Sequence, residues 1–488
     1  MNTELIKKKI LDLAIIGKLV EQRPEDGTAE ELYTQIQEEK KKLIANGKIK
    51  KEKPLPEITE EEIPFDIPEN WKWVRFADII DVRDGTHDSP KYYSNGIPLI
   101  TSKNLNNGAL SFDDIKYISE EDANIINQRS KVDNNDILFA MIGSIGNPVL
   151  VKKDRDFCIK NVALFKNNPY INMNWLYYFL LKEQYELRKN ATGGVQSFIS
   201  LKMFRTNLIP LPPQEEQKRI VDKVEEIFSR IDVIEKAKAD LAKEGNLLEK
   251  KILDLAIRGK LVEQRPEEGS AEELYAQIQE EKQKLISEGK IKKEKPLPEI
   301  TLDEIPFDIP ESWKWIRLGD CVSKTIKRGK SPKYTEKSGT LVFAQKCNSK
   351  YEGIRLDLAL YLDESVLSKY DSTEYMVDKD IVINSTGGGT MGRVGIYKNS
   401  DNPNKLPVVP DSHVTVIRSN NLIDSIYLFY FIKNNQTSLE SLGDGSTNQT
   451  ELKPDTLKEL IVPLPPLAEQ KRIVAKIEEL LPYCDKLK

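Results

Sequence analysis

A long internal repeat constrains the fold of this chain more than any other feature of its sequence. Residues 8–78 align with residues 250–320 at an offset of 242 positions without a gap, and 58 of the 71 aligned positions are identical. A second repeat, at an offset of 253, relates the strings PLPP and EQKRIV after Pro210 to those after Pro463. The segments between these shared blocks do not resemble each other at this level. The sequence therefore predicts two similar units, each with one variable part.

The chain has 488 residues, which is too long for one hydrophobic core. The repeats divide it into six segments. In chain order the predicted segments are an N-terminal helical arm (1–74, a repeat of 246–316), a first variable domain (75–210), a long central helix (211–258), a second helical and extended arm (259–316), a second variable domain (317–463) and a C-terminal helix (464–488).

Apolar residues follow the 4,3 spacing of a coiled-coil seam in three of these segments. In the central helix they are Ile220, Val224, Ile227, Ile231, Ile234, Leu241, Leu248, Ile252 and Leu255, and in the C-terminal helix Ile473, Ile477, Leu480 and Leu487. Gly245 occupies a seam position, which predicts a weakened or kinked helix near residues 243–246. The two terminal helices match the two halves of the central helix. We therefore expect them to pair antiparallel with it in a pseudo-twofold, circularly closed arrangement; a plain dimeric coiled coil is the alternative.

Both variable domains read as mixed helix and sheet, so the predicted fold class is α+β. Short β-branched runs bounded by turn residues predict strands. These runs are Ile79–Val82, Ile97–Thr101, Asp136–Ile142, Lys379–Ile383 and Val414–Ile417. An aromatic-rich helix is expected in each domain, at 175–187 and 426–433.

Composition and motifs exclude several classes of function. No run of about 18 apolar residues exists, so no membrane span is expected. The four cysteines form no CxxC pair, and the N-terminus lacks a signal-peptide pattern, which together predict a cytoplasmic protein. Only two histidines are present, which leaves little room for a metal site or a triad, and none is predicted. Asn167-Asn168-Pro169-Tyr170 and the glycine-rich run at 387–392 each lack essential residues of the catalytic or phosphate-binding motif they approach. We therefore expect no catalytic residues.

The charge distribution bears on nucleic-acid binding. The chain has a net charge of −5, but the two variable domains carry +2 and +1, and residues 324–355 form a basic stripe. Each domain contains loops rich in Lys, Arg, Thr, Ser, Asn, Gln and Tyr, the residue types that contact phosphates and base edges. The candidate DNA-binding residues are Arg83, Thr86, His87, Lys91, Tyr92, Lys103, Asn104, Gln196, Ser197, Lys327, Arg328, Lys330, Lys333, Tyr334, Gln345, Lys346, Asn348, Lys350, Thr447, Asn448 and Gln449.

Taken together, these features resemble the DNA-specificity (S) subunits of type I restriction-modification systems. The resemblance covers essentially the whole chain. It rests on KILDLAI-x-GKLVEQ and IPFDIPE-x-WKW, which each occur twice, on the two PLPP-x-x-EQ-x-RIV strings, and on the alternation of variable and helical segments.

The resemblance implies a non-catalytic subunit whose two variable domains are target-recognition domains. Each would read one half of a bipartite, asymmetric double-stranded DNA target. The helices would set the spacing and dock two methyltransferase (M) subunits and, indirectly, restriction (R) subunits. No cofactor is expected in this chain: S-adenosylmethionine would belong to the M subunits, and ATP and Mg²⁺ to the R subunits. The alternatives are a protein-only coiled-coil scaffold and a stand-alone DNA-modifying enzyme.

Overall fold

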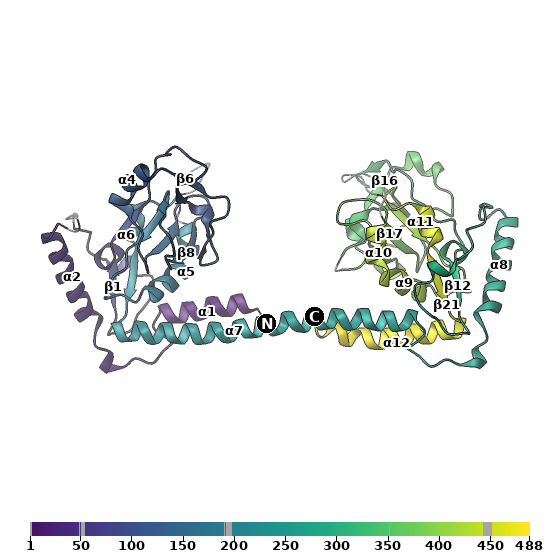
Figure 1. The fold of residues 1–488 in the computed structure, drawn as a ribbon, viewed down its shortest axis with the longest axis horizontal. Coiled ribbons are helices and arrows are strands. Elements are labelled where there is room, and N and C mark those ends of the chain that lie inside the picture. The colour runs from purple at the N-terminus through teal and green to yellow at the C-terminus, as the bar shows by residue number, and fades with distance from the viewer. Residues whose placement is uncertain are drawn as a thin grey trace. The chain divides into compact units, whose positions relative to one another are not determined.

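The computed structural model describes residues 2–47, 49, 54–189, 191, 198–350, 352–442 and 451–488. The chain forms two compact units, Met1–Lys236 and Ala237–Lys488. The long helix α7 (Gln214–Ile257) contributes its first part to unit 1 and its second part to unit 2 (Figure 1).

Unit 1 contains a helical arm and a mixed α/β domain that share one core. Strand β1 (Lys72–Arg75) closes the domain by pairing antiparallel with β11 (Leu208–Leu211). The main sheet has the order β2 (Val82–Asp84), β10 (Val162–Phe165), β7 (Ile137–Ala140) and β8 (Gly146–Leu150), and all neighbours are antiparallel. A second sheet has the order β6 (Lys116–Ile118), β3 (Ile97–Ile100) and β9 (Cys158–Ile159), and β4 (Leu105–Asn106) pairs with β5 (Ala109–Leu110). The helices are α1 (Thr3–Ile15), α2 (Ala29–Ala45), α3 (Phe76–Ile79), α4 (Glu120–Ser130), α5 (Met173–Lys189) and α6 (Leu201–Thr206).

Unit 2 repeats this plan with different loops. Strand β12 (Lys314–Arg317) pairs with β21 (Ile461–Leu464). The main sheet has the order β13 (Lys327–Arg328), β20 (Val414–Ile417), β17 (Ile381–Asn384) and β18 (Val394–Ile396). A second sheet has the order β14 (Tyr334–Thr335), β16 (Leu360–Leu362), β15 (Leu341–Phe343) and β19 (Val408–Pro410). The helices are α8 (Ala271–Ser287), α9 (Ser425–Asn434), α10 (Gln436–Ser441), α11 (Pro454–Glu459) and α12 (Leu467–Asp485). The predicted mixture of helices and sheets is confirmed.

One predicted strand is wrong. Residues 79–82 were expected to be extended, but Ile79 ends helix α3 and the strand begins only at Val82. The side chains of Phe76 and Ile79 are both 1% exposed. A helical turn is the conformation that directs both of these large side chains, three positions apart, into the same core.

Terminal helices run antiparallel to α7 within each unit. In unit 1, Lys7 of α1 forms ion pairs with Asp232 and Glu235 of α7 at 3.0 and 3.3 Å. In unit 2, Lys488 is paired with Glu249. Figure 1 shows α1 and α12 each alongside its part of α7. Helix α7 continues without a break through residues 243–246, and the predicted weakening or kink there stays a prediction. A side chain at Gly245 would meet the carbonyl oxygen of Cys484 at 2.8 Å, which indicates that glycine permits close helix packing there.

Burial of the predicted seam is uneven along α7. Its ends are buried, at Ile220, Val224, Ile231 and Ile252, as are Ile473 and Ile477 of α12. Ile227, Leu255, Leu480 and Leu487 are half-buried. In contrast, Ile234, Leu241 and Leu248 are exposed. The structure therefore leaves apolar surface uncovered on the middle of this helix, where a soluble monomer would normally carry polar residues.

The repeated Glu-Gln pair has a structural role in both units. Gln217 accepts a hydrogen bond from the amide of Asn172 at 2.8 Å and donates one to the carbonyl of Pro212 at 3.0 Å. Glu469 in unit 2 accepts hydrogen bonds from Trp313 Nε1 at 2.9 Å and Gln264 Nε2 at 2.6 Å, and burial raises the pKa of its carboxyl group. The pair thus connects the start of each long helix to the arm and to the domain.

Gln217→Leu is expected to lower the free energy of unfolding by about 2–4 kcal/mol, because it leaves the partly buried amide of Asn172 and the buried carbonyl of Pro212 without their Gln217 partner. Urea titration monitored by tryptophan fluorescence measures this change. Gln214→Leu, at an exposed position of the same helix, is the matched control and should change the value by no more than about 0.5 kcal/mol. Equal effects of the two substitutions would contradict the assigned role of Gln217.

Candidate nucleic-acid interface

Loops gather at one end of the main sheet in each unit. In unit 1, β2 and β7 end there and β10 and β8 begin there, because neighbouring strands are antiparallel. Isolated bridges pair Thr86 with Lys160 and Ile142 with Phe198. In unit 2 the corresponding bridges pair Lys330 with Asp411 and Thr386 with Glu451. The two units therefore build the same loop cluster from different side chains.

A glycine starts the first loop of each cluster. A Cβ atom at Gly85 would lie 2.4 Å from the carbonyl oxygen of Ile159, and one at Gly329 would lie 2.0 Å from that of Pro410. Only glycine fits these positions, because the loop passes directly over the neighbouring backbone.

Gly329→Ala is expected to displace the loop that carries Lys330 and Lys333 and to lower the stability of unit 2 by roughly 1–3 kcal/mol. Thermal unfolding and DNA affinity should both fall. Gly339→Ala is the control, since no heavy atom lies within 4 Å of its added Cβ. A Gly329→Ala protein with unchanged unfolding and affinity would show that the close approach has no consequence.

A hydrogen-bond network around Asp84 organises the cluster of unit 1. The buried Asp84 carboxylate lies 2.9 Å from Nε2 of His87 and is also paired with Arg129. The other ring nitrogen of His87 lies 2.9 Å from Oδ1 of Asn161. A small cavity of about 190 Å³ lies beside His87, with Ile142 and Phe198 in its wall. The ring of Phe198 is 43% exposed, so this cluster presents an apolar surface beside a polar one.

The cluster of unit 2 is polar throughout. Gln345 Nε2 donates to the carbonyl and hydroxyl oxygens of Thr386 at 2.5 and 2.7 Å, and this hydroxyl lies 2.8 Å from Nδ1 of His413. Arg328 forms an ion pair with Glu451 at 2.8 Å. These contacts connect side chains from five separate segments of the chain, at Arg328, Gln345, Thr386, His413 and Glu451.

Much of the predicted basic stripe is neutralised inside unit 2. Lys327 and Lys330 both contact the buried carboxylate of Glu374, at 2.6 and 3.1 Å, and Lys333 contacts Asp363 at 2.8 Å. Burial would raise the pKa of Glu374, but the two ammonium groups lower it below its ordinary value. Burial lowers the pKa of Lys324 to about 8. The stripe is therefore less positive than its composition indicates.

Several predicted contact residues are placed away from solvent. Asn104 and Asn348 are buried and hold their own loops: Asn104 accepts from Thr101 and donates to Ser111, and Asn348 donates to Asn384 and to the Arg393 carbonyl. Both amides are therefore engaged inside the protein, and base contact by Asn104 and Asn348 stays a prediction that this structure does not support. Arg83 points toward Asp81, at 2.6 Å, rather than into the loop cluster.

Other predicted residues lie at the surface. Lys91, Tyr92, Lys103, Tyr334, Lys346 and Lys350 are exposed, and Thr86 accepts a hydrogen bond from the amide of Asp88. Gln196, Ser197, Thr447, Asn448 and Gln449 lie outside the described residues. Sequence reasoning missed Asn161, Thr386, His413 and Glu451 as members of the clusters, because they stand alone between strands. Only the strand register brings them beside the predicted loops.

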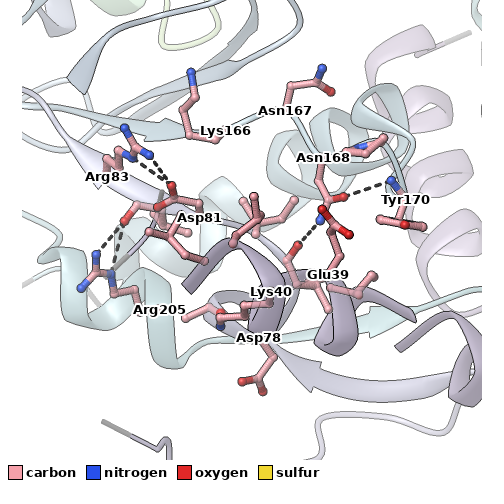
Figure 2. Close-up of a pocket in the computed structure, with 18 of the residues that line it drawn as sticks. Glu39, Lys40, Asp78, Asp81, Arg83, Lys166, Asn167, Asn168, Tyr170 and Arg205 are labelled. Atoms are coloured by element: carbon pink, nitrogen blue, oxygen red, sulfur yellow. Dashed lines mark hydrogen bonds and ion pairs between the residues drawn. The ribbon is translucent and has the colours of Figure 1, made fainter. Parts of the chain in front are cut away.

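A larger cavity of about 920 Å³ lies in unit 1 between α2 and the start of the domain. Figure 2 shows Arg83 directed at Asp81. Arg205 donates a hydrogen bond to the carbonyl of Val82 at 2.9 Å. Asn168 in its wall accepts from the Tyr170 amide and donates to the Ile79 carbonyl. The Asn-Asn-Pro-Tyr string therefore forms a hydrogen-bonded turn. Of the charged residues that line the cavity, Arg83 is paired with Asp81, and Lys166 is paired with Asp133 and Asp136.

The described residues contain no group of three or more His, Cys, Asp or Glu that could hold a metal ion. Among the same residues, no helix is both long and apolar enough to cross a membrane. The four cysteines are buried and unpaired.

The two repeated units thus carry equivalent loop clusters at one end of an antiparallel sheet, polar in unit 2 and partly apolar in unit 1. A family model for the type I restriction modification DNA specificity domain matches residues 68–243 and 310–488. The chain belongs to this family, whose members are non-catalytic DNA-recognition subunits of type I restriction-modification systems.

Known proteins agree with this assignment. The chain is 29% identical to the type I restriction enzyme EcoAI specificity subunit of Escherichia coli, over 99% of this chain and 90% of that protein. It is 25% identical to the MjaVIII specificity subunit of Methanocaldococcus jannaschii, over 85% of this chain and 87% of that protein. A solved structure concerned with complex assembly of the type I R-M system has the same fold, with a TM-score of 0.59 and 19% identity over 87% of this chain and 93% of that chain.

Proposed function

We propose that the two loop clusters read the two different halves of a bipartite, asymmetric DNA target. The observation that carries this proposal is the placement of equivalent clusters, with different side chains, at the same strand ends of the two units. Equivalent positions support the same task, and different side chains select different bases. Residues 75–210 and 317–463 would be the two target-recognition domains.

The long helices would set the spacing between the half-sites. We propose that α1 and α12, each antiparallel to its part of α7, form a pseudo-twofold, circularly closed coiled coil. The ion pairs of Lys7 with Asp232 and of Lys488 with Glu249 support this pairing at the two parts of α7. The remaining boundaries predicted from the repeats, at 1–74, 211–258, 259–316 and 464–488, belong to the same proposal.

Partner subunits would cover the apolar surface that the helices expose. Leu5 of α1 and Leu247 of α7 correspond through the 242-residue repeat, and they are 62% and 61% exposed. Two equivalent exposed leucines fit two copies of one partner, which we propose to be the methyltransferase (M) subunits. These subunits would bind S-adenosylmethionine, and restriction (R) subunits that use ATP and Mg²⁺ would join through them. We place the assembly in the cytoplasm.

Footprinting of the assembled methyltransferase complex on its target DNA tests this proposal. We expect two protected patches with an unread spacer between them. Affinity should fall steeply with salt concentration, because lysine and arginine contacts to phosphates release counterions. A single continuous footprint, or an affinity that is independent of salt, would contradict the proposal. Absence of any sequence-specific footprint would favour a scaffold that binds only proteins.

A further inference from the structure

The strand register identifies equivalent positions in the two loop clusters. Asp84 is the last residue of β2 and pairs with Ala163, the second residue of β10. Arg328 is the last residue of β13 and pairs with Thr415, the second residue of β20. Asp84 and Arg328 therefore occupy the same place at the start of the first loop, directly before the glycine that the close approach requires.

The residues that face these positions differ between the units. Phe198 is bridged to Ile142 in unit 1, whereas Glu451 is bridged to Thr386 in unit 2. Phe198 and Glu451 each lie three positions before the next helix, α6 or α11. Unit 1 has an exposed aromatic ring at this place. Unit 2 has instead an acidic side chain that forms an ion pair with Arg328.

Contacts in unit 2 restrict the direction of the Arg328 side chain. Its guanidinium group forms an ion pair with Glu451 at 2.8 Å, the side chain is 25% exposed, and its buried Nε has no hydrogen-bond partner among the described residues. The backbone of Glu451 is paired with that of Thr386, and the carbonyl and hydroxyl oxygens of Thr386 accept hydrogen bonds from Gln345. An arginine held in this way loses little freedom when it binds a planar acceptor pair.

The ion pair also favours one kind of DNA contact. The carboxylate of Glu451 offsets the charge of Arg328, and this weakens attraction to a phosphate. The directional donors of the guanidinium fork remain suited to the O6 and N7 acceptors of guanine. We propose that Arg328 reads a guanine in the half-site of unit 2 and that Glu451 is the residue that positions its guanidinium group. This inference rests on the proposed function. Unit 1 has no arginine at the equivalent place, so the other half-site is read without this contact.

Methylation maps test this inference in cells that express the chain with its cognate methyltransferase subunits. Arg328→Lys keeps the charge and removes the fork. We expect it to lower methylation of the native target by roughly 5- to 150-fold and to relax the preference for guanine at one position. Glu451→Ala should relax the same position, and Glu451→Gln, which retains an acceptor oxygen, should restore part of the preference. The other half of the target should not change with any of these variants.

Arg355→Gln is the matched control, because Arg355 also forms ion pairs with acidic neighbours, Glu352 and Asp357, but lies outside the cluster. It should leave the target unchanged. A native unit 2 half-site without guanine would overturn the inference. A uniform loss of methylation by the Arg328→Lys variant, with an unchanged target sequence, would also overturn it, because that result indicates a phosphate contact. If the native chain directs no bipartite methylation, the proposed function fails and the inference fails with it.

Discussion

Replacing Leu5 and Leu247 together by glutamate is expected to release both methyltransferase subunits from this chain. The two leucines are equivalent in the repeat and are largely exposed. In the proposed complex each would be buried against a partner, and a buried glutamate without a counter-charge is strongly unfavourable. A central interface residue contributes about 2–4 kcal/mol, so docking at each site should weaken by roughly 30- to 700-fold. Co-purification followed by mass measurement gives the number of bound subunits.

The single variants test the two proposed docking sites separately. Leu5→Glu and Leu247→Glu should each lose one partner copy and retain the other. Leu302→Glu is the control, because Leu302 is 88% exposed and lies outside the long helices. Since all three leucines are exposed, none of the changes should alter the free energy of unfolding by more than about 0.5 kcal/mol. Full binding of two subunits by the double variant would contradict the proposed docking surface.

Exchange of one recognition domain is expected to change one half of the DNA target and to leave the other half intact. The structure indicates where to join the chains. Arg75 is buried and donates to the carbonyls of Pro56 and Thr206, and β1 pairs with β11. Replacing residues 76–207 by the matching segment of a relative with another target keeps both strands and the side chain of Arg75 in place.

Methylation at the original target should then fall by about 1,000-fold or more, the usual ratio of specific to non-specific binding. A new target should appear that combines the donor's half-sequence with the native half that unit 2 reads. The reciprocal exchange within residues 317–463 is the control and should change only the other half. A change in both halves after either exchange would contradict independent reading by the two units.

Much of the fold follows from local patterns in the sequence. The repeat predicts two units, and the seam spacing predicts a helix that the structure places at Gln214–Ile257. Tertiary packing determined the features that local sequence patterns did not predict. Residues 76–79 form a helix because Phe76 and Ile79 both enter the core, and glycine at position 245 of α7 leaves room for the close approach of the Cys484 backbone.

The candidate interface was less predictable than the fold. In the sequence, Lys327 and Lys330 indicate a basic surface. In the structure, both lysines form ion pairs with Glu374, which lies more than 40 positions later in the chain. Asn104 and Asn348 have the residue type of base readers, but they are buried as loop supports. Nothing in the sequence marks Glu451 as part of the candidate interface. Its proposed positioning role depends on its ion pair with Arg328, which lies 123 positions earlier in the chain.

The adenine methylation map of cells that express this chain with its cognate methyltransferase subunits tests the central claim most directly. The control is the same subunits without the chain. We predict a split target, with two defined half-sequences and an unread spacer, that is methylated only when the chain is present. Identical maps with and without the chain, from cells in which the complex is folded and assembled, would contradict its assignment as the source of DNA specificity.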